Sequence, residues 1–158
     1  ITWWKKYSIW INQIVTSKQE VSSSLDLEFK ISDPIPEFQL KSVKNNRYTN
    51  SNELNIHNKL LIFFDKDCIH CNNNFEHFLA LREEHNKKID FIIIFREESF
   101  AKALEISELY ENELDIYVVR DETFKKFKLR FLPAFVKLNK RSLIELSTPV
   151  PLEIIRSI

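Results

Sequence analysis

The stretch KLLIFFDKDCIHC, residues 59–71, holds both cysteines of the chain, Cys68 and Cys71. It opens with a continuous apolar run at residues 60–64, which is typical of a strand covered on both faces of a mostly parallel sheet. From Cys71 to about residue 86 the apolar residues recur at helical spacing. The sequence therefore predicts a Cys-x-x-Cys pair at the point where a buried strand passes into a helix.

This position favours redox chemistry. The amide groups and the positive dipole end of the helix stabilise a thiolate on Cys68, and His70 adds a positive charge between the two cysteines when it is protonated. Three residues of separation let the two side chains meet, so a disulfide between them can open and close with little backbone motion. In this interpretation Cys68 is the nucleophile and Cys71 the resolving thiol.

Two other interpretations of the pair stay open. A short Cys-x-x-Cys is also half of many zinc sites, with His77 and His85 as the nearby additional ligands. Seven residues separate these histidines, however, and the chain has no second cysteine pair, so the usual finger spacing is missing. The cysteines can also be purely structural, either as inert core thiols or as a permanent disulfide, although so small a loop restrains the unfolded chain weakly.

The rest of the chain alternates strand and helix patterns. Before the cysteines, residues 25–31 alternate as a half-buried strand does, and a further short strand pair is expected around an Asn-rich turn near Phe38 and Tyr48. After them we expect a strand at 89–95, a helix at 99–112, a strand at 115–120, a short helix at 121–128, a hairpin of 134–138 with 142–146, and a helix from Pro151. Such alternation implies an α/β domain whose mixed sheet is covered on both faces.

Residues 1–24 differ from this pattern. Aromatic and aliphatic side chains fall on one face of a predicted helix, and a polar, Ser-rich connector follows at residues 16–24. We therefore divide the chain into this helix with its connector, residues 1–24, and a domain at residues 25–158. The helix either packs on that domain or adjoins a membrane anchor removed with the natural start, since the chain begins at Ile1 and has no Met.

Composition narrows the function classes. The 23 Lys and Arg residues balance 23 Asp and Glu residues without a long block of one sign, which disfavours nucleic acid as a partner. The chain contains no Gly, so we expect Asn or Asp at turns that need a left-handed residue, for example at residues 44–46, 50–52 and 139–140.

Four segments together resemble the successive landmarks of the thioredoxin-like fold: residues 33–40, 59–71, 121–127 and 131–138. The leading Pro-x-Phe-x-Leu, residues 36–40, is most similar to the membrane-anchored extracytoplasmic thiol-disulfide oxidoreductases of the ResA and TlpA type. The resemblance covers about residues 33–148. It implies a three-layer fold, with a central mixed sheet, helices on both faces, an N-terminal β extension and, in this chain, the additional aromatic helix.

The resemblance also implies an activity and a set of site residues. In the family the first cysteine attacks and the second resolves, which carries over to Cys68 and Cys71. A cis proline that faces the disulfide corresponds to Pro133, and the backbone of Leu132 would pair with the substrate. The implied function is disulfide exchange with protein thiols or disulfides, outside the cytoplasmic membrane, with no metal and no cofactor beyond the disulfide; a membrane redox partner is compatible with it.

The chain departs from the family at several positions. Asp67 stands where an aromatic residue commonly precedes the first cysteine, and its charge opposes the effect of His70 on a thiolate. Ile62 replaces the buried acid of thioredoxins, and Phe131 replaces a Gly, where its side chain narrows the substrate groove. With Ile69, His70 and Asp67 as tuning residues, the direction of electron flow stays open. A binding module with a structural disulfide is the alternative function.

Overall fold

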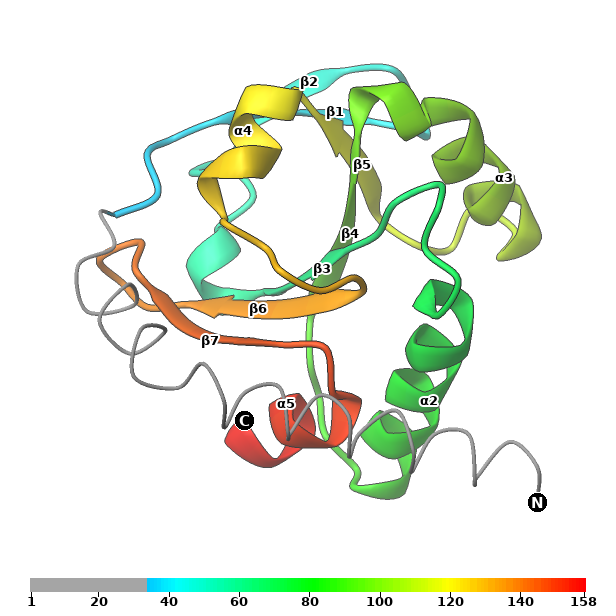
Figure 1. Ribbon diagram of the computed structural model, residues 1–158, viewed down its shortest axis with the longest axis vertical. Coiled ribbons are helices and arrows are strands. Elements are labelled where there is room, and N and C mark those ends of the chain that lie inside the picture. Colours follow the sequence, from blue (N-terminus) through cyan, green and yellow to red (C-terminus); the bar gives the residue numbers. More distant parts are fainter. Residues whose placement is uncertain (1–33) are drawn as a thin grey trace. The chain divides into compact units, whose positions relative to one another are not determined.

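Strand β3 (Leu60–Phe63) lies in the interior of a mixed sheet of seven strands in the order β2-β1-β5-β4-β3-β6-β7. The computed structural model describes residues 34–158 (Figure 1). The expected aromatic helix, its connector and the expected strand at 25–31 lie outside the described residues. The other strands are β1 (Gln39–Ser42), β2 (Tyr48–Asn50), β4 (Phe91–Arg96), β5 (Ile116–Val119), β6 (Ala134–Leu138) and β7 (Ile144–Thr148).

The central strands are parallel and the edges are antiparallel. β4 pairs with β3 on one side and with β5 on the other, all three parallel, while β6 runs antiparallel to β3. β1 and β2 form an antiparallel hairpin that joins the sheet through β5, and β6 and β7 form the second hairpin. The parallel strands are connected through helices, as such strands must be.

Helices cover both faces of the sheet. They are α2 (Cys71–Glu84), α3 (Phe100–Leu109), α4 (Asp121–Lys126) and α5 (Pro151–Ser157), with short 3₁₀ turns η1 (Ile56–Asn58) and η2 (Glu97–Ser99). Consecutive residues of β3 point to opposite faces: Ile62 packs in the cluster that includes α2, α3 and α5, and Phe63 in the cluster that includes α4. The expected α/β architecture, with helices on both faces of a mixed sheet, is confirmed.

Element boundaries follow the sequence patterns closely. The helix expected at residues 99–112 starts as the 3₁₀ turn η2 and ends at Leu109, and the hairpin's second strand starts at Ile144 and extends to Thr148. No helix among residues 34–158 combines the length and the apolar character needed to cross a bilayer.

Helix ends show how the chain turns without glycine. After the end of α2, Asn86 is in the left-handed region. Its N–H donates to the Glu83 carbonyl and the Lys87 N–H donates to the Arg82 carbonyl, the bonding pattern of a Schellman motif. Asn fills four left-handed positions in the described part of the chain, and one of them, Asn46, lies in an expected turn. The expected turns at 50–52 and 139–140 hold no left-handed residue, and Glu111, Lys128 and Ser142 fill other such positions, so the restriction to Asn and Asp was wrong.

Candidate active site

Cys68 and Cys71 form a disulfide, with their Cα atoms 5.5 Å apart. Cys71 is the first residue of α2, and Cys68 lies in the turn before it, where its N–H donates to the Asp65 carbonyl at 3.2 Å. The bond therefore joins a loop residue to a helical one. His70 is the N-cap of α2, without a side-chain capping bond, and its carbonyl accepts the first helical hydrogen bond, from the Asn74 N–H at 3.0 Å.

The two sulfur-bearing residues differ in exposure. Cys71 is 3% exposed and belongs to the core under α2, whereas Cys68 is half-buried at the edge of the same core. Between them Ile69 is 87% exposed, which is unusual for a large apolar side chain. Among the described residues, the disulfide is therefore more accessible from the side of Cys68 and Ile69 than from that of Cys71.

A second loop shares this surface. The Leu132–Pro133 peptide bond is cis, and Pro133 is buried just before β6, whose first residue, Ala134, pairs with Phe63 at the end of β3. Phe131 and Leu132 line a pocket of about 550 Å³ together with Asp67, Cys68, Ile69 and His70. Phe131 is 37% exposed and forms part of the wall, and the pocket stays open beside it. The structure thus brings together around one pocket all the sequence-predicted site residues except Cys71 and Pro133, which are buried next to it.

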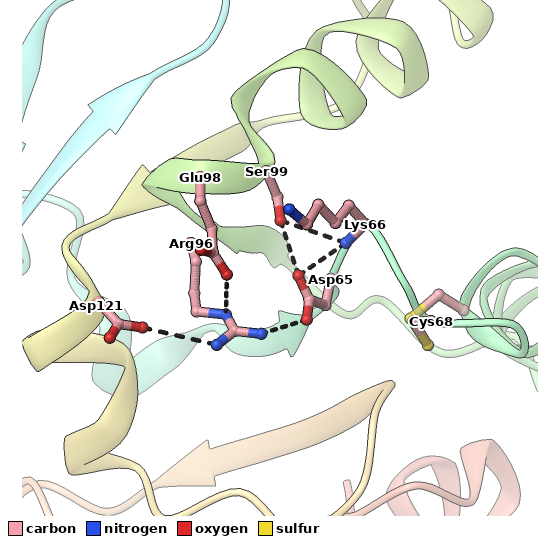
Figure 2. A network of polar contacts seen from close by, with 8 residues as sticks. Asp65, Lys66, Cys68, Arg96, Glu98, Ser99 and Asp121 are labelled. Atoms are coloured by element: carbon pink, nitrogen blue, oxygen red, sulfur yellow. Dashed lines mark hydrogen bonds and ion pairs between the residues drawn. A yellow bond between two sulfur atoms is a disulfide. The ribbon is translucent and has the colours of Figure 1, made fainter.

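A polar network around the buried Asp65 holds the start of the cysteine loop, where the chain leaves β3 (Figure 2). Asp65 directly follows the apolar run of β3 and is only 9% exposed. One of its oxygens accepts hydrogen bonds from the Ser99 hydroxyl at 2.7 Å and from the Lys66 N–H at 2.8 Å, and the other pairs with the Arg96 guanidinium. Figure 2 shows the carboxylate turned toward Arg96 and Ser99, with Cys68 further along the loop.

The network also reaches α4. The Arg96 guanidinium contacts Asp121 at 3.6 Å and Glu98 at 3.6 Å, and it lies over the ring of Phe124, 5.2 Å from the ring centroid.

Burial by itself raises the pKa of Asp65, but the hydrogen bonds from Ser99, Arg96 and Lys66 and the charge of Arg96 outweigh it, so the pKa is lowered from 3.8. Asp65 is therefore a charged anchor at neutral pH.

This network was not predicted from the sequence. The positions of the charged residues relative to the strands could have indicated it. Asp65, Arg96 and Asp121 each come at or just after the carboxyl end of one of the parallel strands β3, β4 and β5. Carboxyl ends of neighbouring parallel strands meet at one edge of a sheet, so opposite charges at those ends come into contact. Asn74, one helical turn after Cys71, was missed as well; it is 4% exposed, and its Nδ2 has no hydrogen-bond partner among the described residues.

The zinc interpretation finds no supporting geometry in the described part of the chain. Among residues 34–158 no three His, Cys, Asp or Glu side chains lie where they could share a metal ion. His77 lies on α2, where burial lowers its pKa and Glu84 opposes that effect, and His85 follows the last residue of the same helix. The cysteines are bonded to each other instead.

Comparison with solved structures identifies the architecture. The chain is similar to the thioredoxin domain of a thiol-disulfide oxidoreductase from Bacteroides vulgatus, with a TM-score of 0.53 and 15% identity over 80% of this chain and 95% of that one. The chain has a thioredoxin-like fold. It is also similar to an exposed lipoprotein thioredoxin from Streptococcus pneumoniae, with a TM-score of 0.56 and 14% identity over 78% of this chain and 100% of that one.

A third thioredoxin-like neighbour is a thiol:disulfide interchange protein from a Bacteroides species, with a TM-score of 0.54 and 14% identity over 80% of this chain and 86% of that one. No protein-family model and no curated protein sequence matches the chain. The expected thioredoxin-like fold is confirmed, and at these identities the likeness concerns the fold alone.

Proposed function

We propose that the protein is a thiol-disulfide oxidoreductase that exchanges its Cys68–Cys71 disulfide with thiols of partner proteins. One observation carries the proposal: on a thioredoxin-like fold, a disulfide between a half-buried loop cysteine and the first residue of a helix opens onto the same pocket as the loop that ends at Leu132. The structural neighbours described as thiol-disulfide oxidoreductases support it.

The exchange proceeds in two displacements. A substrate thiolate attacks Sγ of Cys68, the Cys68–Cys71 bond breaks, and Cys71 leaves as a thiolate that takes up a proton. A second substrate thiolate then attacks the substrate sulfur of the mixed disulfide and releases Cys68. The substrate loses two electrons to form its disulfide, the protein gains them, and the reverse sequence reduces a substrate disulfide.

The remaining site residues receive supporting roles in this proposal. The Leu132 backbone next to Pro133 would pair with the substrate chain, because a proline has no N–H to compete for the sulfur. Phe131 would limit the width of the groove. His70 and Asp67, on either side of Cys68, would adjust the stability of its thiolate in opposite directions, and Ile69 would offer an apolar contact.

Thiol reactivity tests the proposal. After reduction, Cys68 should react with iodoacetamide much faster than Cys71 at neutral pH, as measured by mass spectrometry of quenched samples. Cys71→Ser should accumulate a mixed disulfide with a model substrate at Cys68, while the matched variant Cys68→Ser should accumulate none. Equal, slow alkylation of both cysteines would instead favour the binding module with a structural disulfide.

The direction of electron flow depends on the reduction potential of the pair. Equilibration with glutathione buffers measures it. A potential near that of thioredoxin, about −270 mV, makes the protein a donor of electrons, and one near about −120 mV makes it an acceptor.

We place the protein on the extracytoplasmic side of a membrane. An exposed lipoprotein among the structural neighbours supports this location, and disulfides persist in oxidising compartments. The aromatic segment at residues 1–24 would adjoin the anchor and the domain would comprise residues 25–158; a membrane redox partner would restore the disulfide or the thiols. Fractionation of cells that make the full-length protein, with protease digestion of the intact cells, tests location and anchoring together.

A further inference from the structure

The pocket beside the disulfide carries an uneven set of charges. Among residues 34–158, its lining includes the basic residues Arg96, Lys125, Lys128 and Arg130, but only two carboxylates, Asp65 and Asp67. Asp65 is already committed to Arg96 in the buried network. The charge that a ligand would meet therefore comes mainly from the segment at residues 125–130, the end of α4 and the loop that leads to the cis peptide bond.

The basic side chains of this segment are accessible. Lys125, Lys128 and Arg130 are exposed, and the one ion pair of Lys125 that the structure records, with Asp121 at 3.0 Å, is itself on the surface. Surface pairs of this kind contribute little and exchange readily with other partners. An acidic ligand can therefore use Lys125 without breaking a buried interaction, and Lys128 and Arg130 are exposed in the same segment.

Apolar side chains complete the pocket next to the sulfur. Ile69 and Phe131 are exposed beside Cys68, while Leu129 and Leu132 are half-buried in the wall. A concave site with low-polarity walls and charges of one sign concentrates counter-charged ligands and raises their association rate. Asp67 directly precedes Cys68, so its charge disfavours a carboxylate immediately beside the reacting sulfur.

We infer that this pocket selects thiols and disulfides that carry carboxylates a few residues from the reacting cysteine, that is, acidic segments of partner proteins. The inference rests on the proposed function, since the selection acts on the exchange reaction. The favoured substrate thiolate attacks Sγ of Cys68, displaces Cys71 as a thiolate and forms the mixed disulfide while its carboxylates lie against the cations at residues 125–130.

Three synthetic peptides test the inference on the oxidised protein. Each has one central cysteine, and positions two and three residues away on both sides are all Glu, all Gln or all Lys. The opening of the Cys68–Cys71 disulfide is followed by acid quenching, alkylation and mass spectrometry. Each rate constant is divided by that of the same peptide with hydroxyethyl disulfide, a neutral reagent, because neighbouring charges also change the reactivity of the peptide thiol.

The expected normalised order is Glu, then Gln, then Lys, with a Glu-to-Lys ratio of about ten at low ionic strength. The ratio should fall toward one in about 0.5 M salt, where surface charges are screened within a few ångström. Normalised rates that are equal for the three peptides at low salt would overturn the inference and leave the proposed function intact. Failure of every peptide to open the disulfide would overturn the proposed function itself.

Charge reversal locates the effect. The double variant Lys128→Glu with Arg130→Glu should invert the Glu-to-Lys ratio. Its matched control, Lys88→Glu with Lys140→Glu, changes the net charge equally at two exposed positions, one after α2 and one in the β6–β7 turn, and should keep the wild-type ratio. An equal change of the Glu-to-Lys ratio in both double variants would show that the preference comes from the overall charge of the protein. It would overturn the inference that the pocket selects acidic substrates.

A single substitution and a small thiol provide two further tests of the inference. If circular dichroism shows that the double variant is unfolded, Lys128→Gln alone should lower the ratio about twofold to fivefold, the effect expected of one exposed charge pair, and an unchanged ratio would contradict the inference. Glutathione, a small thiol with carboxylates, distinguishes the source of the charge: a normalised rate below that of the Glu peptide supports an acidic protein segment, and a higher one overturns that assignment in favour of a small thiol.

Discussion

Asp65 and Asp67 are two residues apart in the same loop, yet they lie in different environments. Asp65 is buried, accepts hydrogen bonds from Ser99 and Lys66 and pairs with Arg96. Asp67 is exposed and lines the pocket beside Cys68. The loop therefore has a structural end, fixed to the carboxyl ends of the parallel strands, and a chemical end, exposed to solvent. Residue type alone does not distinguish the two.

Removing the buried carboxylate should have the largest effect on stability. Asp65→Ala should lower the free energy of unfolding by about 2–4 kcal/mol, because it leaves Arg96, Ser99 and the Lys66 N–H without their shared acceptor. Urea denaturation of the oxidised protein measures this, with Asp67→Ala as the matched control. Similar losses in the two variants would show that the loop has no fixed end.

Acid should reveal the same anchor in the wild-type protein. The folded-state pKa of Asp65 is lowered from 3.8, so its contribution is complete above that value and is lost as the pH falls through the lower folded-state pKa. The difference in unfolding free energy between wild type and Asp65→Ala should therefore be constant from about pH 5 to 7 and shrink below about pH 4. A difference that grows on acidification would contradict the direction of the shift.

Substitution of Ser99 removes one of the hydrogen bonds that hold Asp65. Its hydroxyl donates to Asp65 at 2.7 Å and accepts from the Lys66 N–H at 3.3 Å. Ser99→Ala should cost about 1–2 kcal/mol. In a double-mutant cycle with Asp65→Ala the two losses should fall short of additivity, since both remove the same interaction, and strict additivity would mean that the two groups act independently.

Asp67→Asn should have the smallest effect on stability, within about 0.5 kcal/mol, because the side chain is exposed. Its effect should appear in the chemistry: without the adjacent negative charge a Cys68 thiolate is more stable, and alkylation of the reduced protein at pH 6 should be about twofold to fivefold faster. A loss of stability as large as that of Asp65→Ala, with no change in alkylation, would reverse the assignment of the two ends.

Local sequence patterns were sufficient for the elements. The run at residues 60–64 and the helical spacing after Cys71 identified β3 and α2 because burial on two faces and burial on one face leave different periodicities. The same two patterns placed Cys68 and Cys71 at the junction between the strand and the helix. The helix, connector and strand expected within residues 1–31 stay predictions, as do the roles of the individual site residues.

The polar network and the charged pocket wall were not predicted, and the reason is physical. Asp65 and Arg96 are 31 residues apart and meet only because β3 and β4 are neighbours in the sheet, a fact that depends on strand order. Lys128 and Arg130 follow α4 without any periodic signal, and their place beside Cys68 depends on how α4 packs. Contacts between residues of different helices and strands could therefore not be predicted from a single sequence.

The absence of glycine affects the unfolded protein as well as the turns. Left-handed backbone at Glu111, Lys128 and Ser142 raises the energy of the native chain, by about 1–2 kcal/mol for each such residue. Glycine would remove that cost, but it would also give the denatured ensemble more conformations, an entropic effect of about 0.4–1 kcal/mol for each position. Each of these turns is thus a compromise between a relaxed native backbone and a less disordered denatured state, and Lys128→Gly would change both at once.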